Sequence, residues 1–240
     1  MYEPRTYRHW IKETDLISFS ASVKETDLYI LAQSNLSKKA LKSIAKHRKS
    51  IEQYIETHPY FLTSLEPVQV EQSAPAIVRD MAIAAQAVGV GPMAAVAGAI
   101  AEAVGKDLVA DSAEIIVENG GDIFLKSNKK RTVGIYAGSS TFTGKIALEV
   151  APHETTLGIC TSSKTVGHSL SFGNADAVIV ISESTPLADA AATAIGNRVK
   201  TIEDISAEIN SSQTINGIAG VVIIKGDNIG IWGDVKLVDL

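Results

Sequence analysis

The segment ADAVIVISESTPLADAAATAIGNR, residues 175–198, decides the fold because a buried strand in it leads directly into a helix of small residues. Ser184 or Thr185 can cap this helix, and Pro186 suits its first turn. Asp189 and Thr193 are four residues apart in a stretch that is otherwise almost all alanine, so they project from the same face. This pair is the first candidate for chemistry.

Two interpretations of the pair remain open. A first-turn carboxylate suits the helix dipole, but it repels a phosphate that the same N-terminus attracts. Mg²⁺ would resolve this conflict, since it takes carboxylate, hydroxyl, water and phosphate oxygens. The alternative is a stabilising Asp189 and a core Thr193 that bonds to its i−4 carbonyl, and the spacing alone favours this alternative.

The rest of the chain predicts an α+β fold with mixed, mostly antiparallel sheets and packed helices. Hairpins are expected at 16–33, 113–127 and around 226–228, with further short strands between 131 and 163. Helices are expected at about 35–58, 74–88, 92–105 and 200–210, and Gly89 and Gly91 are expected to supply positive φ at the break between two of them. We expect a single domain over 1–240, within which residues 1–70 could form a hairpin–helix subdomain.

Composition narrows the function classes. The net charge of −5 disfavours a nucleic-acid surface, although the basic helix around Lys38–Arg48 keeps an RNA-associated role open as a weaker alternative. A single cysteine, Cys160, excludes an intrachain disulfide. The first 15 residues lack the apolar region of a signal peptide, and polar residues and glycines break the apolar stretch 81–104. We therefore expect a cytoplasmic protein with no membrane span.

Two further segments could contact a ligand. VENGGDIF, residues 117–124, places two glycines after an apolar strand, where a backbone can approach a ligand or simply form a hairpin turn. The second segment is GICTSSKTVGHSLSFGNAD, residues 158–176, in which hydroxyl side chains surround Lys164 and His168. These side chains could bind phosphate oxygens and transfer a proton, or the segment could simply be a polar surface loop. No segment matches a dinucleotide fingerprint, a P-loop or a nucleophile elbow.

Taken in order, ENGGDI at 118–123, CTSS at 160–163 with His168, and LADAAATA at 187–194 resemble the motifs of the ApbE superfamily of flavin transferases. The chain as a whole, through VGVGPMAAVAGAIAEAVG and VENGGDIF, looks closer still to the UPF0280 family, an ApbE-like group. The resemblance implies an ApbE-like, T-fold-related architecture. It also implies a Mg²⁺ ion and FAD, from which FMN is transferred to an acceptor protein.

Residue by residue, the resemblance assigns Asp189 and Thr193 to the metal. It assigns the nucleotide to the Asn119–Asp122 turn and to the Thr161–Ser163 loop. His168 is the candidate base. The nucleotide residues are Asn119, Gly120, Gly121, Asp122, Thr161, Ser162 and Ser163. The chain departs from the family pattern where VGVGPMAAV replaces a lysine-bearing element and where HSLSFGNAD lacks the DP and TG pairs.

Two function hypotheses follow. The first is a flavin- or nucleotide-binding protein that carries out Mg²⁺-dependent phosphoryl (FMN) transfer or FAD diphosphate hydrolysis. The second is a non-catalytic binder of a small phosphorylated or anionic metabolite on the same fold, which the missing motif elements favour. The expected partners are a small nucleotide or flavin, an acceptor protein and a second copy in a homodimer, with no membrane and no nucleic acid.

Overall fold

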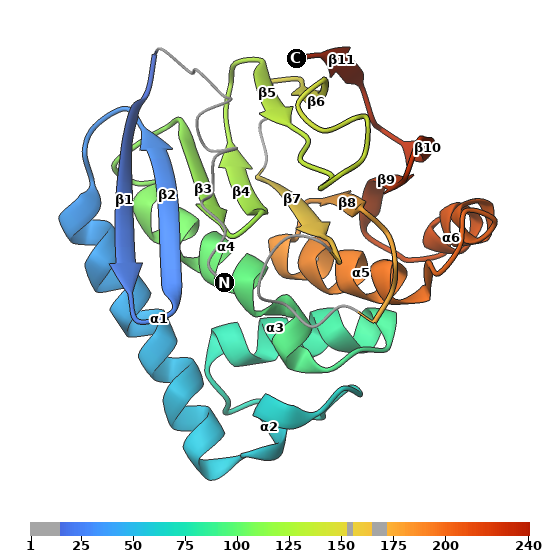
Figure 1. Ribbon diagram of the computed structural model, residues 1–240. Coiled ribbons are helices and arrows are strands. Elements are labelled where there is room, and N and C mark those ends of the chain that lie inside the picture. Colours follow the sequence, from blue (N-terminus) through green and yellow to red (C-terminus); the bar gives the residue numbers. More distant parts are fainter. Residues whose placement is uncertain (1–14, 153–155, 165–171) are drawn as a thin grey trace.

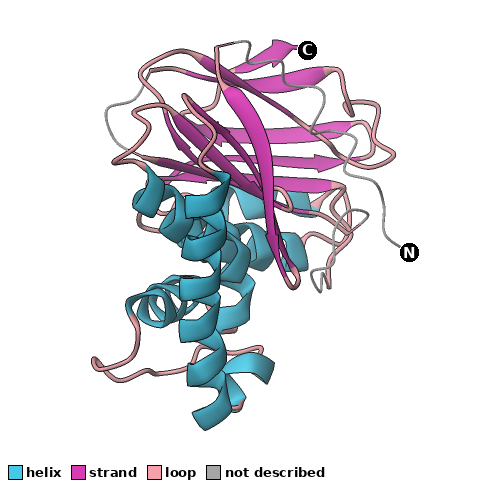
Figure 2. Cartoon of the chain, turned by 90° about the vertical axis from the view of Figure 1, so that its left-hand side faces the viewer, coloured by secondary structure: helices cyan, strands magenta, loops and turns pink. Residues whose placement is uncertain are grey.

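A computed structural model describes residues 15–152, 156–164 and 172–240, and it has three layers: helices, a large sheet and a small sheet (Figures 1 and 2). The helical elements are α1 Ser37–Thr57, α2 Tyr60–Thr63, α3 Ala76–Val88, the 3-10 helix η2 Pro92–Ala95, α4 Val96–Leu108, α5 Thr185–Arg198 and α6 Asp204–Ser212. The first seven strands are β1 Ile17–Val23, β2 Thr26–Ala32, β3 Ile115–Asn119, β4 Asp122–Lys126, β5 Arg131–Gly134, β6 Ile146–Val150 and β7 Leu157–Ser162. The last four are β8 Ala177–Ser182, β9 Ile218–Lys225, β10 Asn228–Gly233 and β11 Leu237–Asp239.

The large sheet has the order β1-β2-β3-β4-β7-β8-β9-β10, and every neighbouring pair in it is antiparallel. The small sheet, β11-β6-β5, is also antiparallel. The chain leaves the large sheet after β4, builds β5 and β6 in the small one, and returns as β7 beside β4. The α+β prediction with mostly antiparallel sheets is therefore confirmed.

Each face of the large sheet buries its own apolar core, as period-2 alternation of side chains requires. One face packs against the helices: Phe124 of β4 is fully buried against α4, and Cys160 of β7 lies in the core beneath α5. The other face packs against the small sheet, where Leu125 of β4 and Leu148 of β6 share a core. Successive residues of β4 and β7 therefore face different layers, so predicted site residues that are adjacent in the sequence lie on opposite sides of the large sheet.

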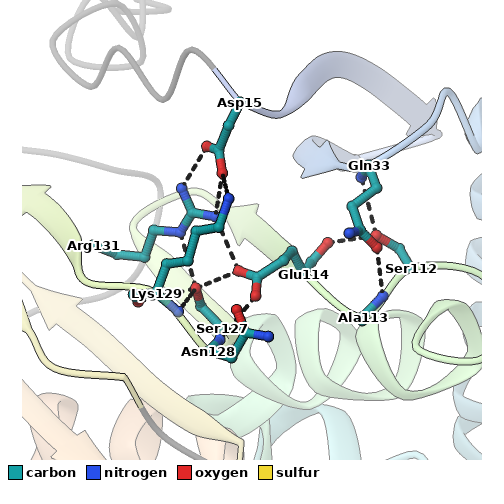
Figure 3. A network of polar contacts seen from close by, with 9 residues as sticks. All are labelled: Asp15, Gln33, Ser112, Ala113, Glu114, Ser127, Asn128, Lys129 and Arg131. Atoms are coloured by element: carbon teal, nitrogen blue, oxygen red, sulfur yellow. Dashed lines mark hydrogen bonds and ion pairs between the residues drawn. The ribbon is translucent and has the colours of Figure 1, made fainter.

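A buried polar cluster fastens the start of β5 to the strand β3 of the large sheet (Figure 3). The Arg131 guanidinium, 2% exposed, donates to Glu114 at 2.9 Å and to Asp15 at 2.8 Å. Ser127 also donates to Glu114, and the Asn128 amide donates to its second oxygen at 2.9 Å. Burial raises the pKa of Glu114, but these hydrogen bonds outweigh it and the net pKa lies below its usual value.

The glycines at the α3–α4 break have different roles from those predicted. Gly89 ends α3 in the left-handed conformation, with φ of 75°, as expected. Gly91 has φ of −73°, so the expectation of positive φ there is wrong. A Cβ on Gly91 would lie 1.8 Å from the Ser64 carbonyl oxygen, which shows that close packing against the 59–72 connection is what requires glycine.

In the described part of the chain, no single helix is long and apolar enough to cross a membrane. Helix α3 and the η2–α4 segment meet that criterion only as a pair, which is bent by 106°. Two lysines of the basic helix α1 form ion pairs with carboxylates near the end of α4. Lys39 pairs with Asp111, which lies just beyond α4, and Lys46 pairs with Asp107 in its last turn.

Candidate functional site

The candidate site lies where the N-terminal turns of α4 and α5 meet above the ends of β3, β4 and β7. Gly98 makes this approach possible, because a Cβ there would lie 2.6 Å from the Thr185 carbonyl oxygen and 2.8 Å from the Asp189 Cβ. Small residues let two helices approach to this distance. The alanine-rich sequence of α5, predicted as a helix, therefore serves close packing against α4 and the sheet.

Asp189 projects from α5 onto the N-terminus of α4. Its Oδ2 accepts a hydrogen bond from the Gly98 amide at 2.8 Å. Burial raises the pKa of Asp189 to about 7, although the amides of Gly98 and Ala97 act in the opposite direction. Thr193, one turn further along α5, is partly exposed. The structure thus places Asp189 at a helix N-terminus, but at that of the neighbouring helix.

The N-terminus of α5 itself already has protein acceptors. The Thr185 amide donates to Glu102 Oε2 of α4 at 2.7 Å, and the Leu187 amide donates to Ser184 Oγ at 3.4 Å. These acceptors satisfy two of the amides that a helix start otherwise leaves free. A phosphate is therefore not required there, and the expected conflict between Asp189 and a phosphate on its own helix does not arise.

The Gly120–Gly121 turn brings a second carboxylate to the site. Both glycines have positive φ, 68° and 109°, and the flanking residues Asn119 and Asp122 pair across the hairpin. Asn119 Nδ2 donates to the Ala97 carbonyl oxygen at 3.0 Å, so it ties the turn to the start of α4. The predicted hairpin turn is confirmed as geometry, and its contact with a ligand stays a prediction.

Asp122 is 7% exposed and shares the helix-facing side of β4 with Phe124, two residues on. Its Oδ1 is buried and has no hydrogen-bond partner in the described structure. Burial raises the pKa of Asp122 well above its usual value, and the nearby Asp189 raises it further, while the Cys160 thiol and the Thr161 amide lower it. Asp189 therefore acts electrostatically on Asp122, and both carboxylates lie in a desolvated region.

The structure separates the predicted 161–163 group. Ser162 faces α5, since a Cβ on Gly196 would lie 3.2 Å from its Oγ. Thr161 and Ser163 instead line a cavity on the other side of the sheet, toward the small sheet. His168 lies outside the described residues, so its prediction stands untested.

This cavity, of about 110 Å³, was not predicted from the sequence. Most of its lining is aliphatic, and Tyr29, Tyr136, Glu118, the Gly120–Gly121 turn, Thr161 and Ser163 complete it. The alternation of side chains in β3 and β7 could have indicated that Glu118 faces this cavity. Tyr136 could not be found in this way, because it follows β5, which belongs to the small sheet.

The donor set fits Mg²⁺ rather than a softer metal. Within 15–152, 156–164 and 172–240, no three His, Cys, Asp or Glu side chains form a metal-ligand group. Mg²⁺ is typically bound through one or two carboxylates, with water and substrate oxygens completing the octahedron. An unpartnered Asp122 oxygen and the neighbouring Asp189 carboxylate supply such a pair.

Comparisons with known proteins agree with this architecture. An ApbE protein from Thermotoga maritima superposes with a TM-score of 0.62 at 12% identity, covering 90% of this chain and 96% of that one. The flavin transferase ApbE from Vibrio cholerae gives a TM-score of 0.57 at 12% identity, with the same coverage. At these identities the likeness establishes the fold.

Sequence comparisons are more specific. A UPF0280 protein from Methanocaldococcus jannaschii is 45% identical over 219 residues, which are 89% of each chain. One from Methanocella arvoryzae is 42% identical, over 88% of this chain and 86% of its own. The family model described as AbpE bacteria matches residues 8–217. The chain therefore belongs to the UPF0280 family of ApbE-like proteins.

Proposed function

We propose that this protein binds a flavin dinucleotide, or a closely related nucleotide diphosphate, together with Mg²⁺ held by Asp189 and Thr193. The observation that carries the proposal is the pair of neighbouring carboxylates, Asp122 and Asp189, neither of which forms an ion pair with a cationic side chain of the described residues. The solved proteins of the same fold include flavin transferases, which supports FAD as the nucleotide.

The reaction we propose is Mg²⁺-dependent phosphoryl transfer: a hydroxyl of an acceptor protein, or water, attacks the FMN phosphorus of FAD, the diphosphate bond breaks and AMP leaves. When bound, the cation would neutralise charge that develops on the diphosphate, which is the main requirement of such transfers. Gly120 and Gly121 let the backbone approach the phosphates, and Thr161 and Ser163 supply hydroxyl donors on the cavity side. His168 is the proposed base that takes the proton of the attacking hydroxyl.

The fixed orientation of Asp189 supports this proposed role. The Gly98 amide fixes one of its oxygens and so holds the carboxylate against α4. Such preorganisation reduces the cost of assembling a site around a charged ligand. Fixing the carboxylate also depends on Gly98, since any larger residue there would separate the two helices.

Incubation of purified protein with FAD and MgCl₂, followed by chromatography, tests this proposal. We expect AMP and FMN, or FMN attached to an added acceptor protein, to form only with Mg²⁺ and not with Asp189→Ala. If the wild type forms no product and binds FAD no better than Asp189→Ala does, the proposal is wrong.

A second candidate function is non-catalytic binding of a small phosphorylated or anionic metabolite. The segment HSLSFGNAD, which lacks the DP and TG pairs of the flavin transferases, favours it. A molecule that co-purifies with the protein and is unchanged after incubation with Mg²⁺ would support this candidate over the enzyme. A cytoplasmic location and a homodimer remain predictions under either function.

A further inference from the structure

Asp122 is a buried carboxylate to which the family resemblance gives only a place near the nucleotide. It is the first residue of β4, directly after the Gly120–Gly121 turn, and it is 7% exposed. A buried carboxylate without a full set of partners is costly, since desolvation penalises its charge. Native proteins retain such a group where something else compensates it.

The immediate surroundings of Asp122 supply donors to only part of the carboxylate. The Cys160 thiol and the Thr161 amide lie beside it, on the neighbouring strand β7. Its Oδ1 has no hydrogen-bond partner in the described structure, and it is fully buried. The charged groups acting on it there are carboxylates, Asp189 and Glu118, and both oppose its ionisation.

The position of Asp122 relative to the helices determines where Oδ1 can find a partner. Asn119, across the hairpin from Asp122, reaches the Ala97 carbonyl at the start of α4, and the adjacent Gly98 amide holds Asp189. Asp122 shares this helix-facing side of the sheet, whereas Glu118 lies on the cavity side. The two carboxylates Asp122 and Asp189 thus converge from the sheet and from α5.

We propose that Asp122 is a second carboxylate ligand of the divalent cation, with its Oδ1 completing the site that Asp189 begins. The proposal rests on the proposed function, because it extends that metal site to a residue on β4. It gives the Gly-Gly turn a further role: the turn sets the position of a ligand to the cation as well as exposing backbone to the nucleotide. Because ligand charge sets cation affinity, the second carboxylate would strengthen binding of the ion before any phosphate arrives.

A titration of metal-free protein with Mn²⁺, followed by electron paramagnetic resonance of the free ion, tests the proposal without any catalytic assay. We expect Asp122→Asn and Asp189→Asn each to weaken Mn²⁺ binding by at least about tenfold, a loss typical of perturbed metal sites. Asp227→Asn, which changes an exposed carboxylate in the β9–β10 turn, is the matched control and should bind like the wild type. Circular dichroism confirms that each variant is folded.

A second readout uses stability. Mn²⁺ should raise the unfolding temperature of the wild type, because a ligand that binds only the folded state stabilises it, and Asp122→Asn should lose most of this increase. If Asp122→Asn binds Mn²⁺ like the wild type while Asp189→Asn does not, the proposal for Asp122 is overturned and the proposed function stands. If all variants and the wild type fail to bind Mn²⁺, both are overturned.

Discussion

Two buried polar clusters in this molecule differ in whether all of their carboxylate oxygens have protein partners. Around Arg131, each Glu114 oxygen has a donor and the guanidinium has two carboxylates (Figure 3). Around Asp122, a buried oxygen has no partner and the neighbouring charged group is another carboxylate. The first cluster is complete without a ligand and joins the two sheets. The second would be completed by the proposed cation, and this difference is what we expect between a structural cluster and a binding site.

The largest effect should come from breaking the complete cluster. Arg131→Met leaves Glu114 buried without its cation, and removing one partner of a buried pair costs about 3–5 kcal/mol. Urea unfolding followed by circular dichroism measures the loss. Lys129→Met, which removes an exposed lysine that pairs with Asp15, is the control and should leave the unfolding midpoint nearly unchanged. A stable Arg131→Met would show that the cluster is not structural.

A smaller loss is expected from Gly98→Ala, which forces α4 and α5 apart. Overpacking of this kind costs about 1–3 kcal/mol, and here it should also weaken Mn²⁺ binding because the Gly98 amide holds Asp189. Gly230→Ala in β10 is the matched control, because its Cβ would meet the Ile205 side chain of α6, several strands away from Asp122 and Asp189. Equal Mn²⁺ affinity in the two variants would argue against the positioning role of Gly98.

Replacing Asp122 should increase the stability of the metal-free protein instead of lowering it. Asp122→Asn replaces a buried carboxyl group, one oxygen of which has no hydrogen-bond partner in the described residues, by a group that cannot ionise, so it should stabilise the metal-free protein by about 1 kcal/mol. Thermal unfolding in the presence of a chelator measures this change. A clear loss of stability instead would mean that the Asp122 carboxylate is already compensated, and the contrast between the two clusters would be lost.

The two clusters should also differ in the direction of their pH dependence. The pKa of Glu114 is lowered in the folded state, so its stabilisation is present above the unfolded pKa of about 4.3 and is lost as the pH falls. Burial raises the pKa of Asp122, and the charge of Asp189 on the same side of the sheet and of Glu118 on the other side raises it further, while the Cys160 thiol acts in the opposite direction. Its ionisation therefore costs no stability below about pH 4, and the cost grows as the pH rises.

Unfolding free energies measured between pH 3 and pH 8 separate the two. The advantage of wild type over Glu114→Gln should shrink at acid pH, and the disadvantage of wild type relative to Asp122→Asn should grow toward pH 8 without metal. Parallel pH profiles for the two variants would contradict the assignment of opposite pKa shifts.

Much of the fold could be predicted from the sequence because its signals are local. Alternation gave the hairpin of β1 and β2, and apolar periodicity gave α1 to within a few residues. The assignment of β5, β6 and β11 to a separate sheet could not be predicted, since it depends on pairings such as Leu237 with Leu148 between distant segments. Gly91 shows the same limit, because its close neighbour Ser64 lies in another element.

The candidate site divides in the same way. The sequence motifs indicated Asp189 and Asp122, but not that Asp189 is held by an amide 91 positions earlier in the chain. Nor did they separate Ser162, which faces α5, from Thr161, which faces the small sheet. Tyr29 and Tyr136 come together only through the packing of two sheets, so no local pattern could indicate them.

The most direct test of the central claim is a crystal grown with MnCl₂ and measured near the manganese absorption edge. We predict an anomalous peak between Asp122 Oδ1 and the Asp189 carboxylate, within about 2.5 Å of both, as expected for oxygen ligands of such an ion. A well-ordered crystal without a peak there, or with the ion bound elsewhere, would contradict the account.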